Sequence, residues 1–190
     1  WTNPDTPRNW AWPKSASRLN AEAYVGLGAN LGNPAQTFAQ ACELIKGFAE
    51  VLGFSKLYRS KPYGFADQPS FVNAAARLRT NLPATELLTK LQQTEQALGK
   101  KVIRENGPRV IDLDLLLYED LVLDTNELQL PHPGILERDF VLCPLLDLNP
   151  DLTHPSWMGT TLQEALERIE TSFLLEEGYE PSGTSDDSQP

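Results

Sequence analysis

Residues 106–118 read Asn-Gly-Pro-Arg-Val-Ile-Asp-Leu-Asp-Leu-Leu-Leu-Tyr, an apolar run that two aspartates interrupt. In an extended strand, alternate side chains share a face, so Asp112 and Asp114 are predicted to lie side by side, with about 7 Å between their Cα atoms. The opposite face then holds the residues that suit a hydrophobic core, namely Ile111, Leu113, Leu115 and Leu117. The stretch therefore predicts a strand with one acidic and one apolar face.

Two like charges on one face of a strand repel each other, and partial burial makes that repulsion more costly. A hard divalent cation such as Mg²⁺ would offset it, and Arg109 at the start of the strand suits a phosphate or one of the two carboxylates. The alternative is an edge strand whose solvated face happens to carry two aspartates. The residue pattern alone leaves both interpretations open.

The composition is that of one ordinary globular domain. The chain has 190 residues, 41% of them hydrophobic and 22% charged, which suffices for one core. A net charge of −10 argues against broad nucleic-acid binding, which requires a basic surface. Residues 171–190 hold five acidic residues and no Lys or Arg, so we expect an acidic, disordered tail there.

Cysteine usage and hydropathy bear on the compartment. Cys42 and Cys143 both lie in apolar patterns and are predicted to be small buried side chains in a reducing, cytoplasmic setting. No apolar run reaches the length of a membrane span, and no charged-then-apolar leader is present. Because the chain begins with Trp1, we expect a processed product or an excised part of a longer polypeptide.

The order of predicted elements indicates the fold class. Residues 21–28 suggest a first strand, Asn33 and Pro34 begin a helix that runs to about residue 49, and strands follow at 51–59 and 71–79. A second helix over 83–98 precedes the aspartate strand, and two shorter helices follow near 137–146 and 160–170. This order predicts an α+β protein with a ferredoxin-like βαββαβ core and a mainly antiparallel sheet. We expect an extension or linker at 1–20, the domain at 21–170 and the tail at 171–190.

Three segments outside the aspartate strand carry candidate binding residues. The loop around 60–73 combines aromatic side chains with Asn73, a pattern that suits a flat heterocycle. His132, Arg138 and Phe140 form a second cluster, with Arg138 a natural phosphate partner. Gln92 and Glu95 share a helix face, and Lys100 begins a basic loop before Arg109. For each there is a structural alternative: a core aromatic, a surface ion pair or a solvated side chain. The glycines of residues 26–32 have the wrong spacing for a dinucleotide-binding turn.

Residues 107–116, Gly-Pro-Arg-Val-Ile-Asp-Leu-Asp-Leu-Leu, closely resemble the signature of the hydroxymethyldihydropterin pyrophosphokinase family of folate biosynthesis. Further blocks resemble the family in the same order: Gly-Ala-Asn-Leu-Gly at 28–32, Phe-Val-Asn-Ala-Ala at 71–75, and Pro-His-Pro at 131–133 with Glu-Arg-Asp-Phe-Val-Leu at 137–142. The resemblance extends from about Ala21 to Ile169.

The resemblance implies an enzyme that transfers diphosphate from ATP to the hydroxymethyl group of 6-hydroxymethyl-7,8-dihydropterin and releases AMP. It implies that two Mg²⁺ ions are bound by Asp112 and Asp114, and that Arg109, Lys100, Asp112 and Asp114 are catalytic. The implied pterin site is Ser60, Pro62, Tyr63, Phe71, Asn73 and Phe140, with Phe71 and Phe140 on the two faces of the ring. The implied ATP site is Gln92, Glu95, Arg109, His132 and Arg138. Family members are sometimes fused to other folate enzymes, so fusion or association with one is a further expectation.

The loop before the signature departs from the family pattern. Lys100 stands at the first of two expected arginines, Val102 at the second and Asn106 at an expected tryptophan, so one guanidinium fork and one charge are lost. Two alternatives therefore stay open: another two-metal nucleotidyl- or phosphotransferase on the same fold, or a non-catalytic domain that binds pterin and nucleotide.

Overall fold

The computed structural model describes residues 20–64, 66–100 and 107–175. Within these residues a five-stranded antiparallel sheet has the strand order β2-β4-β1-β5, with β3 pairing to β4 beyond the end of β2. The strands are β1 (Ala21–Ala29), β2 (Glu50–Phe54), β3 (Tyr58–Ser60), β4 (Phe71–Thr80) and β5 (Asp112–Tyr118). Because β2 and β3 together take the second strand position, this is the predicted ferredoxin-like α+β fold.

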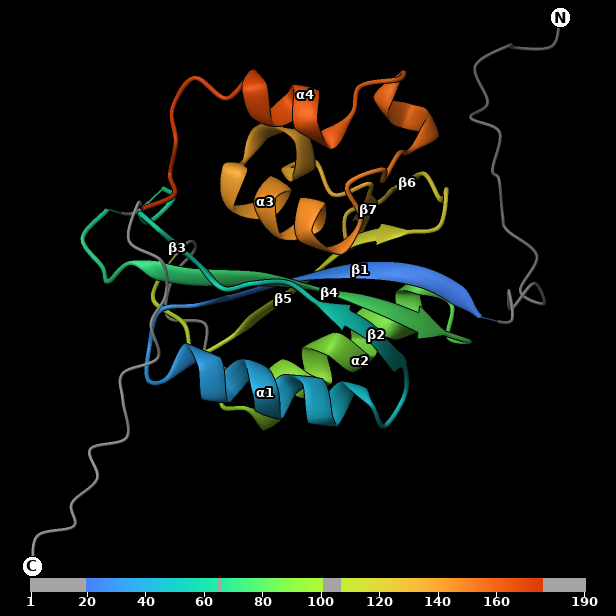
Figure 1. Ribbon diagram of the computed structural model, residues 1–190. Coiled ribbons are helices and arrows are strands. Elements are labelled where there is room, and N and C mark those ends of the chain that lie inside the picture. Colours follow the sequence, from blue (N-terminus) through green and yellow to red (C-terminus); the bar gives the residue numbers. More distant parts are fainter. Residues whose placement is uncertain (1–19, 65, 101–106, 176–190) are drawn as a thin grey trace, which may run out of the picture.

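Helices cover both faces of the sheet, as Figure 1 shows. Helices α1 (Pro34–Ile45) and α2 (Ala84–Ala97) pack on one face, and α3 (Asp139–Leu148) and α4 (Leu162–Glu167) lie over the other. A short hairpin of β6 (Leu123–Asp124) and β7 (Gln129–Leu130) and a 3-10 turn, η1 (Ile135–Glu137), connect β5 to α3, and a second 3-10 turn, η2 (Pro155–Trp157), lies between α3 and α4. The predicted first helix ends earlier than expected, at Ile45.

The start of α1 follows directly from its sequence. Asn33 is the N-cap residue and its side chain accepts a hydrogen bond from the Gln36 amide at 3.2 Å, while Pro34 occupies the first turn, where its missing N–H is not needed. The buried face of α1 carries Phe38, Ala41 and Ile45 against the sheet. The cap and the proline were both readable from sequence.

Alternation along β1 separates the two cores. The odd-numbered residues from Ala21 to Ala29 are buried against α1 and α2, whereas Tyr24 belongs to the cluster under α3 and α4. In β5, Leu113 and Leu115 join the first core, as predicted. Leu117 does not: the register with β1 shifts after Leu115, and this β-bulge turns Leu117 to the second core. Its predicted placement was wrong because one extra residue reverses the side-chain parity of the strand.

The structure differs from two other predictions, the full burial of the cysteines and the start of the tail at residue 171. Cys42 and Cys143 are free and half-buried, not fully buried. Residues 171–175, which composition placed in the tail, lie against β3, where the Lys61 amide donates to the Phe173 carbonyl at 2.8 Å. The rest of the predicted tail and nearly all of the predicted 1–20 extension lie outside the described residues. No helix within the described part of the chain is both long and apolar enough to span a membrane.

Candidate functional site

The candidate site is a cavity of about 280 Å³ on the sheet face that carries α3. Its floor consists of two rows of residues that pair across β4, β1 and β5. One row is Asn73, Gly28 and Asp112, and the next is Ala75, Gly26 and Asp114. At the centre of each row stands a glycine, so no β1 side chain fills the space above the floor. A Cβ added at Gly28 would lie 3.7 Å from Asn73 Oδ1, inside the cavity.

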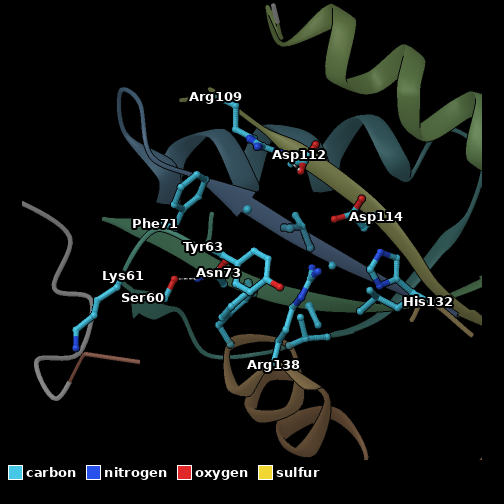
Figure 2. Close-up of a pocket in the computed structure, with 18 residues that line it drawn as sticks. Ser60, Lys61, Tyr63, Phe71, Asn73, Arg109, Asp112, Asp114, His132 and Arg138 are labelled. Atoms are coloured by element: carbon cyan, nitrogen blue, oxygen red, sulfur yellow. Dashed lines mark hydrogen bonds and ion pairs between the residues drawn. The ribbon is translucent and has the colours of Figure 1, made fainter. Parts of the chain in front are cut away.

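Most of the predicted site residues line this cavity. Figure 2 shows Arg109, Asp112 and Asp114 along one side, with His132 beside Asp114, and Phe71, Tyr63 and Asn73 toward the other; Arg138 extends toward the centre and Lys61 points away. The predicted residues that line it are Ser60, Tyr63, Phe71, Asn73, Arg109, Asp112, Asp114, His132, Arg138 and Phe140. Asp112 and Asp114 therefore do share one face, as the alternation predicted.

Asp112 has a cationic partner at each carboxylate oxygen. Lys100 Nζ lies 2.6 Å from Oδ1, and Arg109 Nη1 forms an ion pair with Oδ2. Lys100 also donates to Glu95 Oε1 at 2.7 Å. Burial by itself lowers the pKa of Lys100, but hydrogen bonds to Asp112 and Glu95 outweigh it and raise the pKa, so the lysine stays charged. Lys100 thus keeps its charge at the site through two carboxylates, although it lacks the fork of an arginine.

Asp114 has a different environment from its neighbour. Burial within the site raises the pKa of Asp114 to about 7, and the charges of Asp112 and Glu95 act in the same direction. Although the Asp114 side chain is exposed on the cavity side, the protein atoms packed around its carboxylate make the charged form less favourable. Direct cationic partners therefore hold Asp112, whereas Asp114 faces the cavity as a disfavoured charge.

Glu95 and Gln92 do not line the cavity. Glu95 is buried and accepts a hydrogen bond from the Leu113 amide at 2.6 Å as well as from Lys100. Burial raises its pKa. Gln92 is exposed on α2. The two residues predicted to share a helix face thus differ: Glu95 is buried and binds Lys100, whereas Gln92 is exposed.

An aromatic wall stands opposite the carboxylates. The ring centroids of Tyr63 and Phe140 lie 6.3 Å apart, and Phe173 contacts both rings, at 5.4 Å from Tyr63 and 6.0 Å from Phe140. The Arg138 guanidinium lies over the Tyr63 ring, 4.4 Å from its centroid. Phe173 was not predicted, because it lies in a segment whose composition indicated disorder.

Arg109 covers the remaining aromatic residue of the cavity. Its guanidinium carbon lies 5.7 Å from the centroid of the Phe71 ring. The same guanidinium reaches Asp112, so Arg109 connects the aromatic part of the cavity to its acidic part. Such a side chain can neutralise charge on a phosphate while packing against a planar group.

His132 and Arg138 border the cavity from the segment after β7. The His132 amide donates to the Leu116 carbonyl at 2.8 Å, and its Nδ1 accepts from the Gly134 amide at 3.1 Å, which orients the ring. Burial and the nearby Arg138 charge lower the pKa of His132. Arg138 packs closely over Gly134, where an added Cβ would lie 2.9 Å from its Cζ atom. The predicted alternative for Arg138, an ion pair with Glu137 or Asp139, is not among the contacts of the described residues.

Asn73 is held by a second polar residue of the cavity. Its Nδ2 donates to Ser60 Oγ at 2.9 Å, and both side chains are buried. The amide is thereby oriented with Oδ1 beside Gly28. Pro62 is half-buried and does not line the cavity.

Asn30 is a residue whose role the sequence did not indicate. Its Oδ1 accepts from the Arg109 amide at 2.8 Å, and its Nδ2 donates to Gln68 Oε1 at 3.0 Å and to the Pro69 carbonyl at 3.1 Å. One buried amide thus joins the turn after β1, the loop before β4 and the start of β5. A buried asparagine in a glycine-rich turn was the available signal, but it was interpreted as turn chemistry alone.

The residues present fit a magnesium ion. The described residues contain no group of three or more His, Cys, Asp or Glu that could hold a metal. Mg²⁺, however, is commonly bound by one or two carboxylates together with substrate phosphates and water. Asp112 and Asp114 supply such a pair of hard oxygen ligands at the edge of a cavity. Of the loop positions where the sequence departs from the family pattern, Lys100 is among the described residues, whereas Val102 and Asn106 lie outside them.

Together, a ferredoxin-like domain and a cavity with carboxylates on one side and aromatic and amide groups on the other define a small-molecule-binding α+β domain. The family of 7,8-dihydro-6-hydroxymethylpterin-pyrophosphokinases (HPPK) matches residues 24–150 of the sequence. This chain belongs to that family.

Individual relatives support the assignment over most of their length. The 2-amino-4-hydroxy-6-hydroxymethyldihydropteridine pyrophosphokinase of Aquifex aeolicus is 40% identical over 135 residues, which cover 71% of this chain and 84% of the relative. The enzyme of the same name from Pseudomonas aeruginosa is 43% identical over 145 residues, 75% of this chain and 88% of the relative.

Longer proteins match as well. The folic acid synthesis protein fol1 of Pneumocystis carinii is 43% identical over 82% of this chain, but the match spans only 21% of that protein, so this chain corresponds to about a fifth of its length. Among solved structures, wild-type HPPK-DHPS of Plasmodium falciparum with pterin and p-hydroxybenzoate has a TM-score of 0.62 at 14% identity, covering 78% of this chain and 41% of that one. The latter similarity supports the fold.

Proposed function

We propose that this chain transfers diphosphate from ATP to the hydroxymethyl group of 6-hydroxymethyl-7,8-dihydropterin, with release of AMP. The observation that carries the proposal is the pairing of Asn73 and Asp112 in one row across the sheet, with only Gly28 between them. A planar ligand that accepts or donates at Asn73 is thereby directed toward the carboxylates. Family membership and the names of the relatives point to the same reaction.

The two sides of the cavity suit the two substrates. Asn73, oriented by Ser60, offers an amide oxygen to the polar edge of the pterin, while Phe71, Tyr63 and Phe140 offer aromatic faces to its ring. Pro62 follows Ser60 in the loop and belongs to the proposed pterin site through the family resemblance alone. We place the ATP phosphates toward Arg109, Arg138 and His132, where positive charge and ring N–H groups line the cavity.

The reaction requires positioning and charge stabilisation but no side-chain nucleophile, because the hydroxyl of the pterin attacks the β-phosphorus directly. Asp112 and Asp114 would hold Mg²⁺, two ions by analogy with the family, which neutralises the phosphates and orients them. Arg109 and Lys100 supply further positive charge beside Asp112. Glu95 fixes Lys100 from behind β5, and Gln92 stays a proposed nucleotide contact on the same helix.

The test is an assay with ATP, Mg²⁺ and 6-hydroxymethyl-7,8-dihydropterin in which the nucleotide product is identified. AMP and the pterin diphosphate are expected in equal amounts. Pyrophosphate release would instead favour a nucleotidyltransferase, and no turnover with both ligands bound would favour a non-catalytic binding domain.

A matched pair of variants tests the pterin side. Asn73→Ala should weaken pterin binding about tenfold or more with ATP affinity unchanged, because a buried hydrogen-bonding partner is removed. Asn81→Ala, the same change at an exposed position just after β4, is the control. Equal pterin affinities of the two variants would contradict the assignment. Fusion to other folate enzymes and a cytoplasmic location stay predictions.

A further inference from the structure

The segment Ser172–Leu175, hereafter the strap, adds a short extended stretch to the edge of the sheet beside the cavity. The Lys61 amide donates to the Phe173 carbonyl at 2.8 Å, and the Leu175 amide donates to the Arg59 carbonyl at 2.9 Å. Ser60 and Leu174 form an antiparallel bridge between these two bonds. The strap therefore pairs with β3 and with the first residue of the loop that carries Tyr63.

A buried carboxylate holds the strap from its other side. Asp139 Oδ2 accepts hydrogen bonds from Ser172 Oγ at 2.7 Å, the Phe173 amide at 2.8 Å and the Leu174 amide at 3.1 Å. Asp139 is 2% exposed and is the first residue of α3. Hydrogen bonds to a charged acceptor are among the stronger ones in proteins, and a carboxylate at a helix N-terminus is favourable. The strap is thus hydrogen-bonded to α3 as well as to β3.

Phe173 extends this connection to the aromatic wall. Its ring packs edge-on against Phe140, at an interplanar angle of 83°, and lies at 57° to the Tyr63 ring. Both of those residues line the cavity, whereas Phe173 does not. Tyr63 comes from the loop after β3 and Phe140 from α3, and no hydrogen bond between described residues joins that loop directly to α3. Phe173 therefore supports both rings from behind the wall.

We propose that the strap is a positioning element of the pterin pocket and that Phe173 is its positioning residue. By connecting the loop after β3 to the start of α3, it fixes the spacing of Tyr63 and Phe140 before a ligand arrives. This inference rests on the proposed function for the identity of the ligand, but not for the mechanical connection. Preorganised rings lose less conformational freedom on binding, so the strap raises pterin affinity. It reaches the phosphate side only indirectly, through Arg138 over the Tyr63 ring, so its effect on ATP affinity is smaller.

The test compares Phe173→Ala and Phe173→Leu with Thr171→Ala, a change at the exposed residue just before the strap. Phe173→Ala should raise the pterin Kd by about tenfold, and Phe173→Leu, which keeps most of the apolar volume but no ring, by about threefold. Thr171→Ala should leave it unchanged. The Kd for ATP should change by less than about twofold in all three variants. Thermal unfolding is measured alongside, and if Phe173→Ala does not fold, Phe173→Leu decides by the same criterion.

Amide hydrogen exchange provides a readout that requires no ligand. Faster exchange at the Lys61, Phe173 and Leu174 amides is expected in Asp139→Asn, because a neutral amide holds the strap less strongly. A lower melting temperature in Phe173→Ala with an unchanged pterin Kd would overturn the proposal, since the strap would then stabilise the fold only. If the wild-type chain bound no pterin, the proposed function would fail, while the exchange data would still decide whether the strap connects the loop after β3 to the start of α3.

Discussion

The sheet face beneath α3 and α4 has two halves, a closed half that lies outside the cavity and an open half that contains it, and their carboxylates have different environments. In the closed half, Tyr24 donates to Glu22 Oε1 at 2.8 Å, Arg77 donates to Glu22 Oε2 at 2.7 Å and Asn149 donates to the Tyr24 hydroxyl at 3.3 Å. Burial by itself raises the pKa of Glu22, but the hydrogen bonds from Arg77 and Tyr24 outweigh it, and the pKa lies below its usual value. The carboxylate, hydroxyl and amide groups of Glu22, Tyr24 and Asn149 are thus hydrogen-bonded within this half.

In the open half, the two β1 positions that continue the same face are Gly26 and Gly28. Their neighbours on β5 are Asp114 and Asp112, and burial raises the pKa of Asp114 to about 7. Along this face, β1 thus contributes Tyr24 as a fixed partner to Glu22 at one end and glycines beside Asp112 and Asp114 at the other. Perturbed acids in a cavity are typical of functional sites, and the two glycines of β1 leave the space in which this cavity lies.

Carboxylate-to-carboxamide changes in the two halves should give the largest difference. Asp112→Asn and Asp114→Asn are expected to lower the rate of AMP formation at least about a hundredfold, because a charged group that organises the phosphates is lost. Glu22→Gln is the same chemical change in the closed half, and turnover should stay within about twofold of wild type. Comparable losses in all three variants would remove the distinction between the halves.

The two aspartate variants should also differ from each other when Mg²⁺ is absent. Asp114→Asn is expected to unfold at the same or a higher temperature than wild type, because burial disfavours the Asp114 charge and Asp112 and Glu95 repel it. Asp112→Asn is expected to unfold at a lower temperature, because Lys100 and Arg109 lose their ion-pair partner. Calorimetry with a chelator measures both. Equal destabilisation would contradict the different environments of the two residues.

Adding a methyl group to the cavity floor at Gly28 should have an effect of intermediate size, on pterin affinity. In Gly28→Ala the new methyl group makes only ordinary contacts, the nearest being Asn73 Oδ1 at 3.7 Å, so the fold should persist. Pterin affinity should fall about tenfold, because the methyl occupies space above the cavity floor. Binding is measured by calorimetry and folding by thermal unfolding. A stable variant with unchanged pterin affinity would show that the ligand does not approach Gly28.

The smallest effect concerns the pH dependence of stability in the closed half. Because the folded-state pKa of Glu22 is below its ordinary value of 4.5, its contribution is present above pH 4.5 and is lost as the pH falls through the folded pKa. Wild type should therefore exceed Glu22→Gln in free energy of unfolding by about 1 kcal/mol or less at pH 7. The difference should vanish in acid. Urea unfolding at several pH values measures the difference in free energy of unfolding. A difference that grows on acidification would contradict the predicted direction.

Much of this arrangement was predictable because it follows local rules. Alternation placed Asp112 and Asp114 on one face, and Asn33 with Pro34 gave the start of α1. The element order gave the ferredoxin-like fold. Each of these inferences uses neighbours in sequence, and the physical cause acts over the same short range.

The misses depend on contacts between distant segments. Asn30 looked like a turn residue because its partners lie 38 or more positions away. Phe173 was assigned to a tail because composition does not reveal the hydrogen bonds that Asp139 supplies. The burial of Glu95 was not predicted either: its carboxylate binds Lys100 and the Leu113 amide, while its role in the ATP site stays a prediction. Only the assembled fold brings these groups together.

The bulge in β5 has a consequence for how the sequence of this strand can vary. Before the bulge, alternate residues face the cavity and the first core; after it, Leu117 serves the second core. Substitutions on either side of this point therefore act on different parts of the molecule, although they are only a few residues apart. An insertion or deletion here would exchange the faces of every residue beyond it. A change in the length of this strand should therefore disturb more of the molecule than a change of one side chain.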